Sequence, residues 1–317
     1  MKILVTGAAG FIGYHLCKSL GKNNEVVGID NLDNYYDITL KQNRLKNLKS
    51  VSNFKYVYIE LTGKTLLEHL FLCEKFDAVI HLAAQAGVRY SLEFPEKYID
   101  SNVVGFHNVI NLCKKYKVKE FLYASSSSVY GEQIEQPFKE DQRVDKPVSI
   151  YAATKKANEL IAYSYSHLYN IKTIGMRFFT VYGSYGRPDM AIYLFTDAIA
   201  NNKPINVFNN GDLFRDFTHV EDVVKGIEIL LNNNNIKDNY NVFNIANGKS
   251  EKLDSFINEI EFNLNKKAVR VNMPMQSGDV KKTWANIDKI KELGYCSKVS
   301  IKEGVKEFID WYKTINE

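Results

Sequence analysis

The chain has 317 residues, of which 45% are hydrophobic and 25% charged, and its formal net charge is +4. These values fit one large α/β unit, or a larger half with a smaller second half. No run of Lys and Arg is long enough to indicate nucleic-acid binding, and no apolar stretch approaches the length that spans a bilayer. The chain starts on an apolar strand and its four cysteines are far apart, so we expect a cytoplasmic protein with no signal peptide, disulfide or metal site.

The first 30 residues predict a strand, a glycine turn, a helix and a second strand. The strand over residues 2–6 runs into Gly7-Ala-Ala-Gly10-Phe11-Ile12-Gly13, and the second strand ends on Asp30. Backbone N–H groups of such a turn and the positive end of the helix form a cradle for a pyrophosphate. An acidic residue in the place of Asp30 accepts hydrogen bonds from ribose hydroxyls and repels a 2′-phosphate, which predicts NAD rather than NADP. The alternative for Asp30 is a plain cap of the strand end.

Strands and helices continue to alternate as far as residue 179. We expect strands at 54–59, 77–81, 120–124 and 173–179, with helices between them. This alternation predicts a doubly wound, parallel α/β sheet with helices on both faces. After it come shorter strands and helices. We therefore expect a Rossmann-type NAD-binding domain over residues 1–180, and a smaller α/β domain over residues 181–317 with some segments returning to the sheet.

Tyr151 and Lys155 are the main candidates for chemistry. They are four residues apart on a predicted helix, which places both side chains on one face. A free tyrosine titrates near pH ~10, and a lysine ammonium or an oxidised nicotinamide ring nearby favours the phenolate. Such a tyrosine would take a proton from a hydroxyl while hydride leaves the same carbon. The alternative is an ordinary surface pair on an amphipathic helix.

Several motifs together resemble the extended short-chain dehydrogenase/reductase family, over essentially the whole length. They are Gly7-x-x-Gly10-x-x-Gly13, Asp30-Asn31-Leu32, His81-Leu82-Ala83-Ala84, Ser125–Gly131, Tyr151-x-x-x-Lys155 and Arg215-Asp216-Phe217. Within that family the chain is most similar to UDP-glucuronate 4-epimerases, through the runs Asp33–Asp37, Gln85–Leu92, Arg177–Gly183 and Gly186–Met190. The resemblance implies bound NAD, a C-terminal domain for a UDP-sugar, and a homodimer formed through the helices near 95–116 and 150–168.

The resemblance also implies roles for individual residues. Tyr151 would deprotonate the 4-hydroxyl, Lys155 would lower the pKa of Tyr151 and hold the nicotinamide ribose, and Ser126 would bridge Tyr151 and the sugar. NAD would take hydride from C4 and return it to the other face of a 4-keto sugar. The implied cofactor-binding residues are Gly7, Gly10, Phe11, Ile12, Gly13, Asp30, Asn31, Leu32, Glu60, Leu61, Leu82, Ala83, Ala84, Gln85, Ser101, Ala124, Tyr151, Lys155 and Phe178. The implied substrate-binding residues are Arg89, Ser126, Ser127, Ser128, Tyr151, Thr180, Arg187, Val207, Phe208, Arg215 and Asp279.

The serine run bears on the reaction. A 4-keto uronate is a β-keto acid and loses CO₂ unless its carboxylate is held away from the reactive orientation. Ser127, Ser128 and Thr180 are candidate donors to that carboxylate, and Arg187 is a candidate counter-charge. Related dehydratases and decarboxylases carry acidic residues just after the catalytic Ser/Thr, where this chain has Ser127 and Ser128, so we predict an epimerase. The alternatives are a 4-epimerase of another UDP-hexose, a UDP-glucuronate decarboxylase and a non-catalytic NAD-binding protein.

Overall fold

A parallel sheet of seven strands forms the centre of the computed structural model, which describes residues 1–275 and 280–316. Its order is β11-β6-β5-β4-β1-β2-β3, and every neighbouring pair is parallel. This order confirms the predicted doubly wound α/β class. In chain order the strands are β1 (Lys2–Thr6), β2 (Glu25–Asp30), β3 (Phe54–Tyr58), β4 (Ala78–His81), β5 (Glu120–Ser126), β6 (Lys172–Phe178) and β11 (Tyr240–Ile245).

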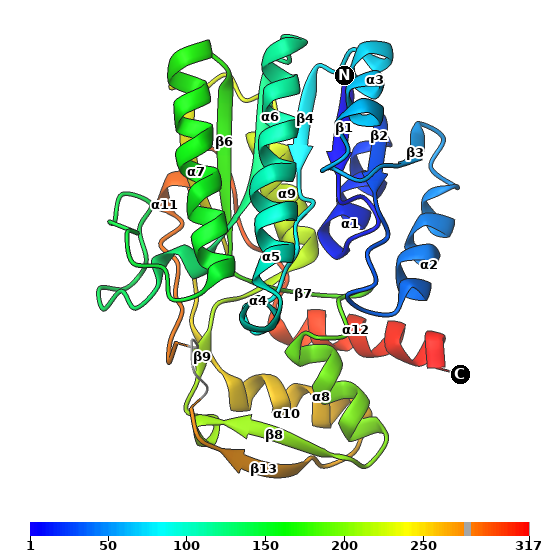
Figure 1. Ribbon diagram of the computed structural model, residues 1–317. Coiled ribbons are helices and arrows are strands. Elements are labelled where there is room, and N and C mark those ends of the chain that lie inside the picture. The colour runs from blue at the N-terminus through cyan, green and yellow to red at the C-terminus, as the bar shows by residue number, and fades with distance from the viewer. Residues whose placement is uncertain (276–279, 317) are drawn as a thin grey trace.

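Helices cover both faces of the sheet (Figure 1). One face carries α3 (Lys64–Glu74), α6 (Phe106–Lys115) and α7 (Ile150–Tyr169), and the other carries α1 (Phe11–Leu20) and α9 (Val220–Leu230), with α2 (Ile38–Leu48) packed beside α1. The helix expected over 95–116 consists of α5 (Pro95–Tyr98), a π-helix η1 (Ile99–Gly105) and α6.

The sheet separates two apolar cores because strand side chains alternate between its faces. In β1, Ile3 and Val5 join one core and Leu4 joins the other, and all three are fully buried. Burial on both faces explains why β1 reads as a continuous apolar run rather than as an alternating pattern. Burying each such side chain contributes roughly 1.5–3 kcal/mol.

The later part of the chain packs below the carboxyl ends of the strands around a third core (Figure 1). It contains α8 (Ala191–Ala200), α10 (Leu253–Leu264), α12 (Ile301–Asn316), and the parallel pair β8 (Pro204–Phe208) and β13 (Val269–Met273). β13 is missing from the predicted elements although its sequence alternates apolar and polar residues, and the strand is largely exposed. Short pairs complete this part: β7 (Thr180–Tyr182) with β10 (Phe217–His219), and β9 (Phe214–Arg215) with β12 (Glu251–Lys252).

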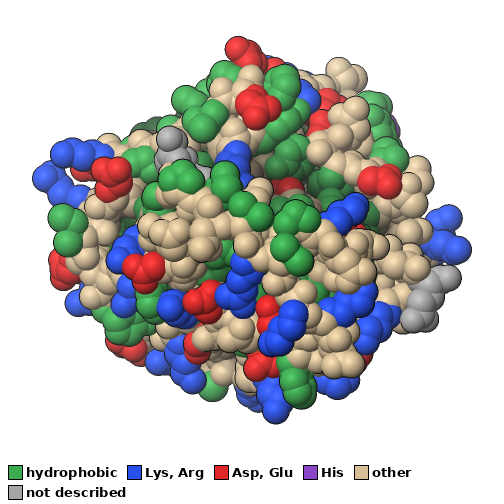
Figure 2. Space-filling view, turned by 90° about the horizontal axis from the view of Figure 1, so that it is seen from below, with side chains coloured by type: hydrophobic (Ala, Val, Ile, Leu, Met, Phe, Trp, Pro, Cys, Tyr) green, Lys and Arg blue, Asp and Glu red, His purple; other side chains and the backbone are tan. Residues whose placement is uncertain are grey.

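The remaining short helices are α4 (Tyr90–Glu93), η2 (Ser127–Tyr130), η3 (Asn209–Gly211) and α11 (Asp288–Lys291). Within the described ranges, no helix has the length and apolarity needed to cross a membrane. Seen from below, the face that carries the later part of the chain shows Lys and Arg side chains interspersed with Asp and Glu (Figure 2). This face therefore presents a mixed surface rather than a continuous basic one.

Candidate active site

A cavity of about 660 Å³ lies at the carboxyl edge of the sheet. The segments after β1, β2, β3 and β4, and the ends of β5 and β6, all contribute to its wall. Thr180, Arg187 and Arg215 line it from the later part of the chain. Open α/β sheets bind ligands at this edge because the loops that leave neighbouring parallel strands meet there.

The glycine turn forms one end of the cavity. Gly7 has φ +74°, and a Cβ on Gly13 would lie 2.0 Å from the carbonyl oxygen of Gly7, so only glycine allows α1 to pack this close to the turn. Gly10 is the N-cap of α1 and gives the helix no side-chain cap. The first-turn N–H groups of α1 are therefore available to an anion, as a dinucleotide pyrophosphate requires.

Asp30 stands at the carboxyl end of β2, buried in the same wall. Its carboxylate accepts hydrogen bonds from the backbone N–H groups of Ala9 (3.2 Å) and Leu32 (2.8 Å). Lys41, which the sequence did not single out, places its Nζ 3.7 Å from Asp30. Asn31 donates to Glu60 at 2.7 Å. These contacts orient the acidic residue toward the space that an adenosine ribose would fill.

Asn102 holds the loop after β4 in place. Its side chain accepts from the backbone N–H of Gln85 (2.7 Å) and donates to the carbonyl of Gln85 (3.0 Å) and to Thr154 Oγ1 (3.1 Å). Asn158 of α7 donates to the Asn102 carbonyl at 2.6 Å. The sequence carried no signal for this residue, because a single Asn within a helix is usually solvent-exposed and here a π-helix directs it inward.

Tyr151, Lys155 and Ser126 all line the cavity. The Lys155 ammonium donates to the carbonyl of Ala124 at 2.9 Å and lies 6.0 Å from the centre of the Tyr151 ring. Burial lowers the pKa of Lys155 to about 8. Ser126 Oγ accepts from the N–H (3.2 Å) and the hydroxyl (2.8 Å) of Ser128.

The surroundings of Tyr151 shift its pKa in both directions. Burial raises it above its ordinary value, because a buried phenolate loses its hydration. The hydrogen bond from Ser126 and the positive charge of Arg187 oppose that effect. Ser126 and Arg187 are therefore protein groups that favour the phenolate here, in addition to the Lys155 ammonium that the sequence predicts for this role.

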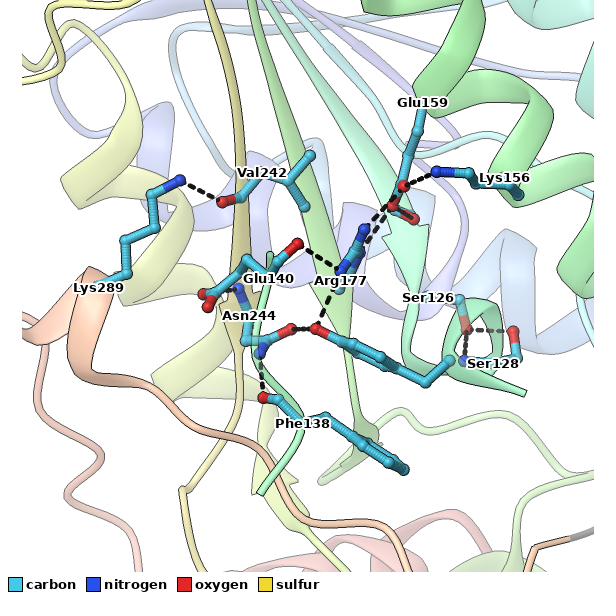
Figure 3. Close-up of polar contacts among 12 residues, drawn as sticks. Ser126, Ser128, Phe138, Glu140, Lys156, Glu159, Arg177, Val242, Asn244 and Lys289 are labelled. Carbon is cyan, nitrogen blue, oxygen red and sulfur yellow. Dashed lines mark hydrogen bonds and ion pairs between the residues drawn. The ribbon is translucent and has the colours of Figure 1, made fainter. Parts of the chain in front are cut away.

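A buried polar network fixes the serine run at both ends (Figure 3). Ser125 donates to Glu159 at 2.7 Å, and Arg177 binds both oxygens of Glu159 at 2.8 and 2.9 Å. Arg177 also donates to the Tyr130 hydroxyl at 3.0 Å, which in turn donates to Asn244 at 2.7 Å. Because α7, β6 and β11 all contribute, three separate elements fix the residues on either side of Ser126, Ser127 and Ser128.

Most predicted site residues share this cavity. All the predicted cofactor-binding residues except Leu32 line it, as do Ser126, Ser127, Ser128, Tyr151, Thr180, Arg187 and Arg215. Arg89 and Phe208 do not; the Arg89 guanidinium lies over the Phe208 ring, 5.4 Å from its centre. The Val207 side chain is buried in the third core, and Val207 pairs with Asn272 of β13 rather than lining the cavity. Asp279 lies outside the described residues.

Arg187 is not a free cation. Its Nε and Nη2 donate to the two oxygens of Asp189 at 2.9 and 2.8 Å, and the Tyr35 hydroxyl donates to the same carboxylate at 3.0 Å. Tyr35 and Lys97 also line the cavity and were not predicted individually. Tyr35 lies in the run Asp33–Asp37 that carried the resemblance, which was the available signal for it.

The geometry described above belongs to a dinucleotide-dependent enzyme with a tyrosine–lysine centre. The model of the NAD dependent epimerase/dehydratase family matches residues 3–246, and the chain belongs to this family. The match confirms the predicted family and its NAD dependence.

The chain is also similar to individual UDP-sugar 4-epimerases. The chain is 44% identical to a UDP-glucuronate 4-epimerase of Thermodesulfobacterium geofontis, over 98% of this chain and 95% of the relative. Its fold is similar to the crystal structure of a Bacillus cereus UDP-glucuronic acid 4-epimerase in complex with UDP-glucuronic acid and NAD, with a TM-score of 0.94, 34% identity and coverage of 99% and 100% of the two chains. A Thermotoga maritima UDP-glucose 4-epimerase with UDP-glucose is similar at a TM-score of 0.90 and 28% identity, covering both chains fully (100% and 100%).

Proposed function

We propose that this chain is a UDP-glucuronate 4-epimerase that interconverts UDP-glucuronate and UDP-galacturonate through a 4-keto intermediate. One observation carries the proposal within the family. Around Tyr151, the wall of the cavity contributed by β5, η2 and β7 consists of hydroxyl-bearing and apolar residues, and none of its described members has a carboxyl group. Ser127, Ser128 and Thr180 therefore offer neutral donors to a sugar carboxylate where an acidic residue would repel it.

The residues present fit NAD. The uncapped first turn of α1 suits the pyrophosphate, and the buried Asp30 suits the adenosine ribose. Lys155 stands beside Tyr151, in reach of a nicotinamide ribose. When bound, NAD would supply a reversible hydride acceptor for C4 of the sugar, so the reaction would have no net oxidation.

The protein's own residues manage the proton. Tyr151 takes the 4-hydroxyl proton, and Ser126 donates a hydrogen bond that stabilises the developing phenolate. Tyr151 would give this proton back to the C4 oxygen when hydride returns to the opposite face of the 4-keto sugar, and C4 would thereby be inverted. The serine and threonine hydroxyls hold the carboxylate meanwhile, which suppresses loss of CO₂.

Incubation of the purified chain with UDP-glucuronate, followed by anion-exchange chromatography and NMR, tests this function. We expect UDP-galacturonate without added NAD and with little UDP-pentose. Mainly UDP-pentose would indicate a decarboxylase. Conversion of UDP-glucose or UDP-N-acetylhexosamine, with none of UDP-glucuronate, would retain the mechanism and overturn the assigned substrate. Absence of any turnover with NAD supplied would favour a non-catalytic nucleotide-binding protein.

We also propose a cytoplasmic homodimer that supplies UDP-galacturonate for polysaccharide synthesis, with residues 1–180 binding mainly NAD and residues 181–317 mainly the UDP-sugar. Support for the dimer comes from one face of the molecule. Ile99 and Val104 of η1 and Leu160, Tyr163 and Leu168 of α7 are large hydrophobic side chains exposed by 40–66%. They lie within the helices through which the family resemblance implies pairing.

A further inference from the structure

Arg187 is held by Asp189, and Asp189 is held in turn by Tyr35. Asp189 binds the Nε and Nη2 edge of its guanidinium through both carboxylate oxygens, and this paired geometry fixes the plane of the group. Among the described residues, no hydrogen bond forms at the remaining Nη1. Since Arg187 lines the cavity, Nη1 is the part of the cation left for a ligand.

Tyr35 adds a third fixed contact from a distant part of the chain. Its hydroxyl donates to Asp189 at 3.0 Å, and its ring packs on Tyr90 with centres 4.7 Å apart. Gly87 has φ +97°, and a Cβ there would lie 2.7 Å from the Tyr35 hydroxyl. Only glycine at this position of the loop after β4 therefore leaves room for the Tyr35 hydroxyl to reach Asp189. The position of Tyr35 is therefore constrained from three sides.

Charge supports the same arrangement. Burial by itself would raise the pKa of Asp189, but pairing with Arg187 and the hydrogen bond from Tyr35 lower it below its ordinary value. Asp189 is therefore ionised at neutral pH, and Arg187 and Asp189 form a locally neutral pair. A neutral pair attracts a sugar carboxylate mainly through the directed N–H groups of Nη1, so the orientation of Arg187 decides how well the carboxylate is held.

We propose that Tyr35 and Asp189 are positioning residues that hold Arg187 with Nη1 toward the carboxylate of the sugar. They act through Arg187 and thereby decide whether a 4-keto uronate is epimerised or loses CO₂. In the side reaction the C5–C6 bond breaks, its electron pair passes to the 4-keto group as an enolate, and C5 takes up a proton. This inference rests on the proposed function, because it assumes a carboxylate at C6.

The test compares Tyr35→Phe and Asp189→Asn with Tyr90→Phe as the matched control. The Tyr90 hydroxyl contacts Lys97 rather than Asp189, so the control removes a hydroxyl from the same aromatic cluster and leaves the ring contact with Tyr35. We expect the ratio of pentose to UDP-galacturonate to rise several-fold in Tyr35→Phe and at least tenfold in Asp189→Asn. Tyr90→Phe should match the wild-type ratio.

A double-mutant cycle separates positioning from general support of the fold. In an Arg187→Met background, Asp189→Asn should change kcat/KM for UDP-glucuronate by less than twofold, because the residue through which it acts is gone. An equal loss in both backgrounds, or single variants that behave like Tyr90→Phe, would overturn the inference. If Asp189→Asn does not fold, Tyr35→Phe still decides it. If the wild type itself makes no UDP-galacturonate, the proposed function fails instead.

Discussion

Tyr151 illustrates how a single residue depends on neighbours from different parts of the chain. The spacing of Tyr151 and Lys155 on α7 leads to the expectation that the lysine sets the phenol pKa. In the folded chain the Lys155 ammonium points to the Ala124 carbonyl, and Ser126 and Arg187 oppose the effect of burial on Tyr151. The remaining stabilisation of the phenolate is left to ligands that bring positive charge.

Replacing Tyr151 by Phe removes the proton acceptor and keeps the ring. We expect kcat for UDP-glucuronate epimerisation to fall by about 10²–10⁴-fold, the usual contribution of a positioned base. Affinity for UDP-glucuronate, measured by isothermal titration calorimetry, should change little. Tyr58→Phe, at an exposed position of β3, is the control with expected wild-type kcat. Retention of wild-type kcat in Tyr151→Phe would exclude Tyr151 as the base.

Lys155 carries a stability cost that depends on pH. Its folded-state pKa of about 8 lies below the ordinary 10.5, so below pH 8 the buried ammonium costs the folded state roughly 3 kcal/mol, and the cost disappears as pH rises to 10.5. The nucleotide-free Lys155→Met variant should therefore be more stable than wild type at pH 7 and lack activity. Urea unfolding at pH 7 and pH 10 measures this; a difference that grows with pH would contradict it.

At the scale of the elements, the contact between Arg177 of β6 and Glu159 of α7 joins helix to sheet beneath the serine run. Both side chains are almost fully buried, at 3% and 1% exposure. Pairing lowers the pKa of Glu159 in spite of its burial, so the carboxylate is ionised in the folded protein. Stability and site geometry depend here on the same contact, since Glu159 also receives the hydrogen bond of Ser125.

Arg177→Met should destabilise the protein by about 3–5 kcal/mol, because it leaves the Glu159 charge buried without its partner. Urea unfolding followed by circular dichroism gives the value. The control is Lys306→Met, which breaks an exposed pair with Asp310 and should have no measurable effect. Equal changes in the free energy of unfolding would show that the buried Arg177–Glu159 pair contributes no more to stability than the exposed Lys306–Asp310 pair.

For the whole molecule, the exposed apolar face of η1 and α7 is the feature that a single chain leaves unexplained. Monomeric proteins seldom leave several large hydrophobic side chains together on one face. We expect the double variant Leu160→Glu/Tyr163→Glu to be a monomer at concentrations where wild type is a dimer, because each charge would be buried in the interface. Light scattering coupled to size-exclusion chromatography measures the mass. If the wild type is a monomer, the proposed dimer does not form. If the double variant is still a dimer, its interface lies elsewhere on the molecule.

The predicted fold and much of the predicted site follow from local patterns. Gly7, Gly10 and Gly13 can be found because close packing of a strand, a turn and a helix tolerates no Cβ there. Asp30 follows an apolar strand in the sequence, and it therefore lies at the carboxyl edge of a parallel sheet regardless of which helices cover that sheet. Such inferences need only backbone geometry, which nearby residues dictate.

The sequence by itself therefore determined the class of fold, the cofactor cradle and the pairing of Tyr151 with Lys155 on one helix. Tertiary structure alone decided which groups from separate segments meet: Arg177 with Glu159, Asn102 with the backbone of Gln85, and Tyr35 with the Asp189 that binds Arg187. It also decided the electrostatic surroundings of Tyr151. The physical reason is that burial and contacts between residues such as Tyr35 and Asp189 arise only when the chain packs, and no periodicity in the sequence encodes them.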